Sequence, residues 1–392
     1  MKLLNLGMLS LLLALSTAGC GGGGGGDSIP SGSTSGGNGN SGGNANNAIL
    51  SGRFALMSAT VGQNAHAVTS GVLTFDGNGG VSAGTTTTFN YSNSNVVSVP
   101  SVVIGGAYSI DGNRNLTGQI TTTGGGTTTV TTATNGRVST NRVYAGANFQ
   151  DNFGNAGVFA LIKPTQNGSN ASLFGTFRFS AAMVGTLQGF EFGTVTFNGA
   201  GGINPGDTIA FSNGQHAQVT GGTYTVNSDG TLTGAVALNN GSTATLQGFV
   251  GDDRTVGVVI QDQAGNLGLG IGSPPPTTTS SNADLNGTGC FLALRTSPIP
   301  GGFITGTASF DGNGGIAANN VLTLSDGLTE TITGGSYNIN PDGTFSSLTV
   351  NTSLWGGVVT TASFLTLGYD KTSVSGVITD SLGEQGMVLF VK

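Results

Sequence analysis

The residue whose surroundings define a chemistry most clearly is Cys20, which ends an N-terminal segment built like an export signal. The chain begins with one positive charge, at Lys2, and a mostly apolar run follows from Leu6 to Leu15. Four small residues, 16–19, then lead into the cysteine. A basic start, an apolar run of about 7–15 residues and small residues at the cut are typical of a secretory signal peptide. We therefore predict that residues 1–19 are a signal peptide. The alternative is an uncleaved anchor, but the run is shorter than the roughly 20 apolar residues that a spanning helix needs.

The ending Thr17-Ala18-Gly19-Cys20 resembles the lipobox of bacterial lipoproteins, although the family prefers Leu at the position of Thr17. The resemblance implies that Cys20 carries a diacylglyceryl thioether and that its freed amine is acylated, for example by palmitate. Several acyl chains together anchor a protein stably to a membrane. In this family an Asp after the cysteine often retains the protein at the inner membrane. Gly21 stands there instead, so the resemblance implies an outer-membrane anchor in the cell envelope, on its periplasmic or its surface face.

Residues 20–48 join this predicted anchor to the rest of the chain. After the cysteine they are mostly Gly, Ser and Asn, with a run of glycine at 21–26. Such a segment buries too little apolar surface to offset the entropy of ordering it, so we predict a disordered, flexible tether.

Metal binding has little support in the sequence. The chain has two histidines, His66 and His216, and one cysteine besides Cys20, namely Cys290. A zinc site needs three or four His, Cys or acidic ligands, so we predict none. Cys290 cannot form a disulfide within residues 49–392, and we expect it to be a buried side chain, with pairing between chains as the alternative. Residues 76–79, Asp-Gly-Asn-Gly, could suggest calcium, but the acidic ligands and final Glu of a helix-loop-helix calcium site are missing, so a hairpin turn is the simpler interpretation.

Catalysis is equally weakly supported. A Ser–His–Asp triad would have to use one of the two histidines, and neither lies in a recognisable nucleophile motif. Paired carboxylates for glycoside hydrolysis are conceivable, although each is explained as well by a turn or a solvated face. The candidates are Glu191, Asp252, Asp253, Glu330 and Asp380. We predict that the protein is not an enzyme and has no catalytic, cofactor-binding or metal-binding residues.

Composition excludes further classes. The chain has 392 residues, 11 basic against 18 acidic, for a net charge of −7. The basic patch that nucleic-acid binding requires is absent, so we predict no nucleic-acid partner. Charged residues make up only 7% of the chain. Few charged residues together with abundant Thr, Val, Ser, Gly and Asn favour strands and turns over helices.

The body of the chain contains three copies of one pattern. The segment 71–81, beginning Gly-Val-Leu-Thr-Phe-Asp-Gly, recurs at 193–203 and again at 306–316. A Leu-x-Gly element precedes each copy, and a Gly-x-Tyr element ending at Tyr108, Tyr224 or Tyr337 follows it. The copies are too long for solenoid repeats, whose periods are about 20–50 residues. We predict three tandem domains at 49–164, 171–273 and 284–392, separated by polar or proline-rich linkers.

Each copy is predicted to be antiparallel β-sheet. Apolar residues alternate with threonine and glycine, as in Val195 and Phe197, which is the period-two pattern of a strand with one buried face. The second copy contains about eight strand-like segments, a spacing typical of a sandwich or barrel. Consecutive hairpins favour an eight-stranded up-and-down barrel. The body resembles uncharacterised envelope lipoproteins, and the predicted barrels look like lipocalin or avidin folds. The repeated Phe75, Phe197 and Phe310, with the three tyrosines, are expected in the core rather than in a ligand cage.

Two functions fit these patterns. The first is a non-enzymatic, lipid-anchored envelope protein with a structural, adhesive or surface-interaction role, held to the membrane through Cys20 and contacting an unknown partner. Its basis is the tether, the low charge and the tandem copies, which would allow avidity from a string of domains. The alternative is a carrier that encloses small apolar ligands inside its barrels. Which face of each strand is buried, and how fully side chains fill the barrel interior, decides between these two functions.

Overall fold

The computed structural model describes residues 45–61, 66–92, 95–184, 189–263, 265–297, 302–325, 327–353, 359–381 and 383–392. The predicted signal peptide, Cys20 and the predicted tether as far as residue 44 lie outside the described residues. Within the described part, no helix is long and apolar enough to cross a membrane.

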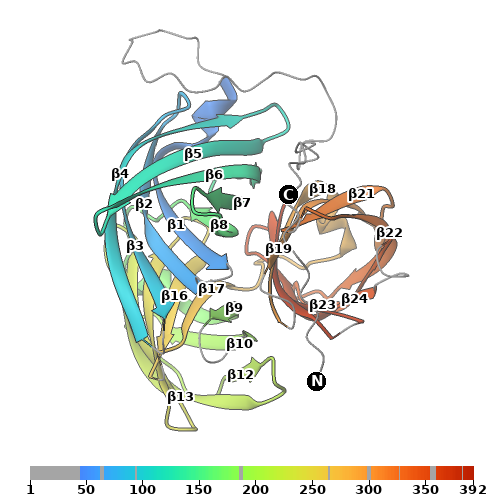
Figure 1. Cartoon of the computed structure of the whole chain (residues 1–392). Coiled ribbons are helices and arrows are strands. Elements are labelled where there is room, and N and C mark those ends of the chain that lie inside the picture. The colour runs from blue at the N-terminus through green and yellow to red at the C-terminus, as the bar shows by residue number, and fades with distance from the viewer. Residues whose placement is uncertain are drawn as a thin grey trace, which may run out of the picture.

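The first repeat forms a closed antiparallel barrel of eight strands in the order of the sequence (Figure 1). Consecutive strands pair as hairpins, and the last strand pairs with the first, for example at Ala59 and Val158. The strands are β1 (Ser51–Val61), β2 (His66–Asp76), β3 (Val81–Ser92), β4 (Asn95–Ile110), β5 (Asn115–Gly124), β6 (Thr127–Val138), β7 (Tyr144–Asp151) and β8 (Ala156–Ile162).

The second repeat forms the same barrel, but the third strand of its ring is interrupted. β11 and β12 both pair with β10 and with β13, and β17 closes the ring on β9. The strands are β9 (Phe174–Val184), β10 (Gly189–Asn198), β11 (Gly202–Ile203), β12 (Thr208–Phe211), β13 (His216–Val226), β14 (Thr231–Leu238), β15 (Thr243–Val250), β16 (Val256–Asp262) and β17 (Leu267–Ser273).

The third repeat copies that interruption with β20 and β21, and β26 closes its ring on β18. Its strands are β18 (Asn286–Ser297), β19 (Gly302–Asp311), β20 (Gly315–Ile316), β21 (Asn320–Leu324), β22 (Thr329–Ile339), β23 (Phe345–Thr352), β24 (Val359–Leu367), β25 (Ser373–Asp380) and β26 (Gln385–Val391). The prediction of three antiparallel eight-stranded barrels is confirmed.

A short 3-10 helix plugs one end of each barrel and explains the repeated tyrosine. The helices are η1 (Ala45–Ile49), η2 (Asn170–Ser172) and η3 (Asn282–Asp284). In the first barrel the Tyr108 hydroxyl donates to the Leu50 carbonyl at 2.6 Å, and the Asn47 side chain accepts the Ile110 N–H at 2.8 Å. Tyr224 and Tyr337 repeat the first bond, and Asn170 and Asn282 repeat the second. The three repeated tyrosines therefore lie in the barrel cores, as predicted from the sequence.

The Asp-Gly-Asn-Gly segment is a hairpin turn whose carboxylate caps the turn's own backbone. One Asp76 oxygen accepts the N–H groups of Asn78 and Gly80 at 2.7 and 2.8 Å. These hydrogen bonds hold the pKa of Asp76 below its usual value. In the second barrel Asn198 makes the same two bonds with a neutral side chain. The turn therefore needs a side-chain oxygen at this position rather than a charge or a cation.

The three barrels pack against one another around a shared hydrophobic junction. Three clusters of buried apolar residues lie inside the barrels, one in each, and a fourth, the junction core, contains seven residues from each barrel. Met57, Phe249 and Leu292 represent the three barrels in it. The contact is close, because a side chain added at Gly146 would meet Leu292 of the third barrel at 2.9 Å. The tandem barrels thus share a core, whereas the sequence had suggested a string of domains.

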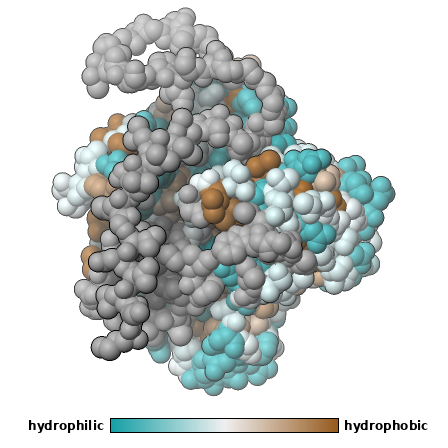
Figure 2. All heavy atoms as spheres, turned by 45° about the vertical axis from the view of Figure 1, so that its right-hand side comes forward, coloured by the Kyte–Doolittle hydropathy of each residue, from teal (hydrophilic) through white to brown (hydrophobic). Residues whose placement is uncertain are grey.

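Ion pairs between barrels surround this core. Arg53 of β1 binds the carboxylate of Asp229 at 2.9 Å and its carbonyl at 2.6 Å. Arg178 of β9 binds Asp342 in the same two ways, at 2.6 Å each. The first barrel is thereby joined to the second, and the second to the third. Asn141 of the first barrel also donates to Asp370 of the third. On the face shown in Figure 2, hydrophobic surface appears only in scattered patches.

Truncation of a junction side chain should destabilise the whole protein. Leu292 is 1% exposed and points out of its own barrel into the junction core. We expect Leu292→Ala to lower the free energy of unfolding by about 2–5 kcal/mol, measured by chemical denaturation, because it removes buried methyl groups and leaves a cavity. Val102→Ala, at a side chain that is 53% exposed, is the control and should change it by less than about 0.5 kcal/mol. If Leu292→Ala and Val102→Ala change the free energy of unfolding by the same small amount, the junction core is not buried in solution.

Candidate functional site

The interior of the first barrel is the main candidate for a functional site. It encloses a cavity of about 400 Å³, whereas the cavities inside the second and third barrels measure about 70 and 80 Å³. Small-molecule sites usually have volumes of about 300–1,000 Å³. Of the three barrels, as far as their residues are described, only the first has room for a small molecule of that kind.

Extra strand length accounts for part of this difference. Tyr108 follows Gly71 by 37 positions, whereas Tyr224 follows Gly193 and Tyr337 follows Gly306 by 31. The additional residues lengthen the hairpin of β3 and β4, which have 12 and 16 residues. Three more residues per strand add about 10 Å at roughly 3.3 Å per residue. The first barrel is therefore taller on this side.

A smaller side chain at one position also contributes to the larger cavity. At the fourth position after the Gly that opens the first strand, the first barrel has Leu56, and the others have Phe179 and Phe291. Phe179 and Phe291 each line the small cavity of their own barrel. At this position the two rings take up space that Leu56 leaves open, although Phe149 and Phe159 line other parts of the first cavity.

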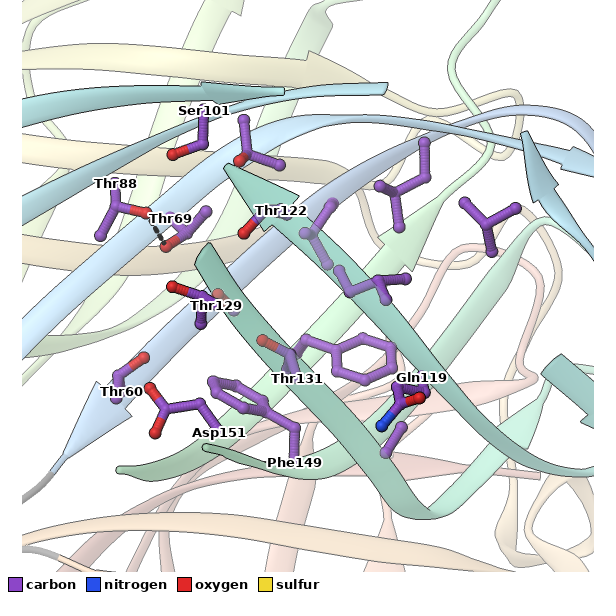
Figure 3. Close-up of a pocket in the computed structure, with 18 of the residues that line it drawn as sticks. Thr60, Thr69, Thr88, Ser101, Gln119, Thr122, Thr129, Thr131, Phe149 and Asp151 are labelled. Carbon is purple, nitrogen blue, oxygen red and sulfur yellow. Dashed lines mark hydrogen bonds between the residues drawn. The ribbon is translucent and has the colours of Figure 1, made fainter. Parts of the chain in front are cut away.

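The cavity wall has two chemically different zones. An apolar floor lies toward the plugged end and is formed by Leu56, Leu73, Phe75, Leu116, Phe159 and Leu161. A hydroxyl belt lies toward the open end and is formed by Thr60, Thr69, Thr86, Thr88, Ser101, Thr122, Thr129 and Thr131. Figure 3 shows belt side chains from several strands around one space. They come from the inward positions of β1, β2, β3, β4, β5 and β6, because every second residue of a strand faces the same side.

Most of the belt is free to bond to a ligand. The hydroxyls of Thr69 and Thr88 lie 3.0 Å apart and bond to each other (Figure 3). Among the described residues, the structure records no hydrogen bond from the hydroxyls of Thr60, Thr122, Thr129 or Thr131, and each of these residues is half-buried. A hydroxyl both donates and accepts, so the belt can pair with water or with polar groups of a ligand.

The open end carries exposed apolar side chains. Phe153, in the turn between β7 and β8, lines the cavity and is 58% exposed. The Asp151 carboxylate shapes this turn by accepting the N–H groups of Phe153 and Asn155, each at 2.9 Å. Across the opening, Val97 is 54% exposed and pairs with Asn90, another cavity residue. The entrance is thus rimmed by an aromatic and an aliphatic side chain.

The cavity holds little charge. Asp151 is the only carboxylate among the described residues that line it, and none of those residues is Lys, Arg or His. Both Asp151 oxygens accept hydrogen bonds from the turn, the second from the Asn155 amide at 2.9 Å. The wall therefore has hydroxyl groups where a site for a charged ligand would need a counter-ion.

The residues weighed for catalysis do not form one site. Glu191 lines the cavity of the second barrel and Glu330 that of the third. Asp252 and Asp253 lie in the turn between β15 and β16, and Asp380 lies 3.8 Å from Arg295 in an ion pair. His66 begins β2 and His216 begins β13, in different barrels. Among the described residues, no three His, Cys, Asp or Glu side chains are grouped as a metal site would require.

The difference between the three barrel interiors was not predicted from the sequence. The carrier alternative specified small apolar ligands, whereas threonine and serine line the upper part of the cavity. Two features pointed to this: the six additional residues in the first repeat, and its threonine runs at 85–88, 121–123 and 127–129. A run of threonine places every second hydroxyl inward once the strand pairing is known.

Comparison with known proteins gives no functional assignment. No protein-family model and no curated protein matches the sequence. Among solved structures, intact Ap-TbpB with its N and C lobes is 10% identical, over 87% of this chain and 77% of its own, with a TM-score of 0.27. A double mutant of transferrin binding protein B from Haemophilus parasuis Hp5 is 9% identical over the same shares, with a TM-score of 0.26. Isotype 1 of that protein from serogroup B Neisseria meningitidis is 9% identical, over 79% of this chain and 65% of its own, with a TM-score of 0.23. Likeness at this level carries no argument about function.

Glu191 predicts a specific pH dependence of stability. Burial, and then repulsion by Asp262, raise the pKa of Glu191 from 4.5 to about 7. Between these values the folded chain keeps a proton that the unfolded chain has lost, so the free energy of unfolding should fall as the pH rises from about 4.5 to about 7. Glu191→Gln should make this slope shallower in denaturation curves measured across that range. Asp76→Asn is the control and should leave the slope unchanged, since the pKa of Asp76 is lowered rather than raised. A slope that Glu191→Gln does not alter would contradict the burial of this carboxyl group.

Proposed function

We propose that this chain is a lipid-anchored protein of the bacterial cell envelope that binds a small molecule inside its first barrel. The observation that carries the proposal is the difference between three barrels of one fold, with cavities of about 400, 70 and 80 Å³. Random loss of packing would not line the largest cavity with hydroxyl groups from six strands. The second and third barrels then serve to hold the first through the junction core.

The location in the envelope is supported by the sequence pattern that ends at Cys20, which favours export and lipid attachment. The proposal places the lipid on Cys20, with the outer membrane as the preferred site because Gly21 follows the cysteine. The structural or adhesive role stays a prediction from composition. It would gain support if the first barrel were found empty.

Native mass spectrometry of the purified protein tests the binding function. We expect one added small-molecule mass per chain rather than three. Thr129→Phe should abolish it, because the ring would project from the inward face of β6 into the cavity. Thr128→Phe, on the exposed outward face of the same strand, is the matched control and should retain the added mass. A bare chain mass in the unmodified protein, or an adduct that Thr129→Phe leaves in place, would contradict the proposal.

Metabolic labelling tests the anchor. In a bacterial host that processes lipoproteins, labelled palmitate should be incorporated into the protein. Cys20→Ser should abolish the labelling, since it removes the thiol that would form the thioether. Val102→Ala, at a side chain that is 53% exposed, is the control and should leave the labelling unchanged. Labelling that persists in Cys20→Ser would place the lipid elsewhere or show a different attachment.

A further inference from the structure

We infer that the first barrel selects an uncharged amphiphile, with an apolar chain or ring system and a head group rich in hydroxyls. It would bind with the apolar part on the floor and the head group at the hydroxyl belt. The inference rests on the proposed function, since it names the chemical class of ligand for the same cavity.

The absence of a counter-ion disfavours an anionic head group. Moving an ionised carboxylate or phosphate out of water is costly unless a cation or several hydrogen bonds compensate it. The described wall offers no Lys, Arg or His, and its one ionisable carboxylic acid, Asp151, would repel an anion. The net charge of −7 on the chain acts in the same direction.

A cationic head group gains little here. Among the described residues that line the cavity, the one carboxylate is Asp151, whose two oxygens already accept three hydrogen bonds from the Phe153–Asn155 turn. A cation bound there would compete with the bonds that shape the entrance. A buried cation also needs a closely placed partner to offset the loss of hydration.

The hydroxyl belt suits a neutral polar head group. Threonine hydroxyls donate and accept, so they match the hydroxyls of a ligand without either side carrying charge. The hydroxyls of Thr60, Thr122, Thr129 and Thr131 make no hydrogen bond to other described residues, and these side chains project from three different strands. Several hydroxyls of one head group could therefore be bonded at once, in place of water.

The apolar floor fixes the orientation of the ligand in the cavity. It is closed by Phe75 and Tyr108, whose rings meet edge to face at 5.1 Å, and by the 3-10 helix behind them. Leu56, Leu73 and Leu161 add aliphatic surface at the same level. Burying apolar surface there contributes about 25 cal/mol per Å², so the apolar part should enter first and the head group should stop at the belt.

Calorimetric titration with three probes of equal chain length tests the inference. The protein is residues 20–392 with Cys20→Ser, purified without detergent, and the probes are monodecanoylglycerol, decanoate and decyltrimethylammonium, each below its micelle concentration. We expect the neutral glyceride to bind at least about tenfold more tightly than either ion, a difference of about 1.4 kcal/mol.

Paired threonine variants locate the head group. Thr122→Val should weaken glyceride binding by about five- to tenfold and leave decanoate unaffected, because it removes one inward hydroxyl at nearly constant shape. Thr123→Val, on the exposed outward face of β5, should change neither.

The outcomes separate this inference from the proposed function. If decanoate or the ammonium probe binds as tightly as the glyceride, and Thr129→Phe abolishes that binding, the cavity is a binding site but the inferred ligand class is wrong. If none of the three probes binds, the inference is wrong, and the native mass measurement decides the proposed function independently.

Discussion

The strands that begin and end each barrel are buried on both faces, and the rest of the structure depends on this constraint. In β1, Leu56 faces the cavity of the first barrel while Met57 and Ala59 face the junction core. β26 likewise contributes Leu389 to the junction core and Phe390 to the interior of its own barrel. β17 contributes Leu269 to the junction core, and the buried residues on its other face are glycines. A closed barrel has no free sheet edge, so the barrels associate through side chains rather than through added strands. Because each barrel supplies seven junction residues, none can leave without exposing apolar surface on the other two.

Although the three barrels share the junction core, their interiors differ. The plug is retained in all of them, with the same tyrosine-to-carbonyl and asparagine-to-amide hydrogen bonds. The second and third barrels complete their packing with rings such as Phe179 and Phe291. The first has a leucine there, a longer β3–β4 hairpin and hydroxyls on the upper wall. Under the proposed function, stability and binding fall to different barrels of one body, which removes the usual conflict between filling a core and keeping a cavity.

Much of the fold could be predicted from sequence because it depends on local patterns. Alternation such as that of Val195 and Phe197 identifies strands, and turns such as Asp76-Gly77 delimit hairpins. The repeated tyrosines were correctly expected in the core for the same reason. The junction core could not be predicted from the sequence. A strand with two apolar faces has the same pattern whether its outer face packs against another barrel of the same chain or against a second copy of the chain. The cavity could not be predicted either, because empty volume depends on how strands of unequal length pair and on which threonines then face inward.

The central claim, that only the first barrel holds a small molecule, is tested most directly by a crystal structure of the protein purified from its envelope without added ligand. The account predicts continuous non-protein density in the first barrel, running from Leu56 and Leu161 on the floor to Thr122 and Thr129 in the hydroxyl belt. It also predicts none inside the second and third barrels. A first barrel closed by its own side chains, or filled only by water, would contradict it.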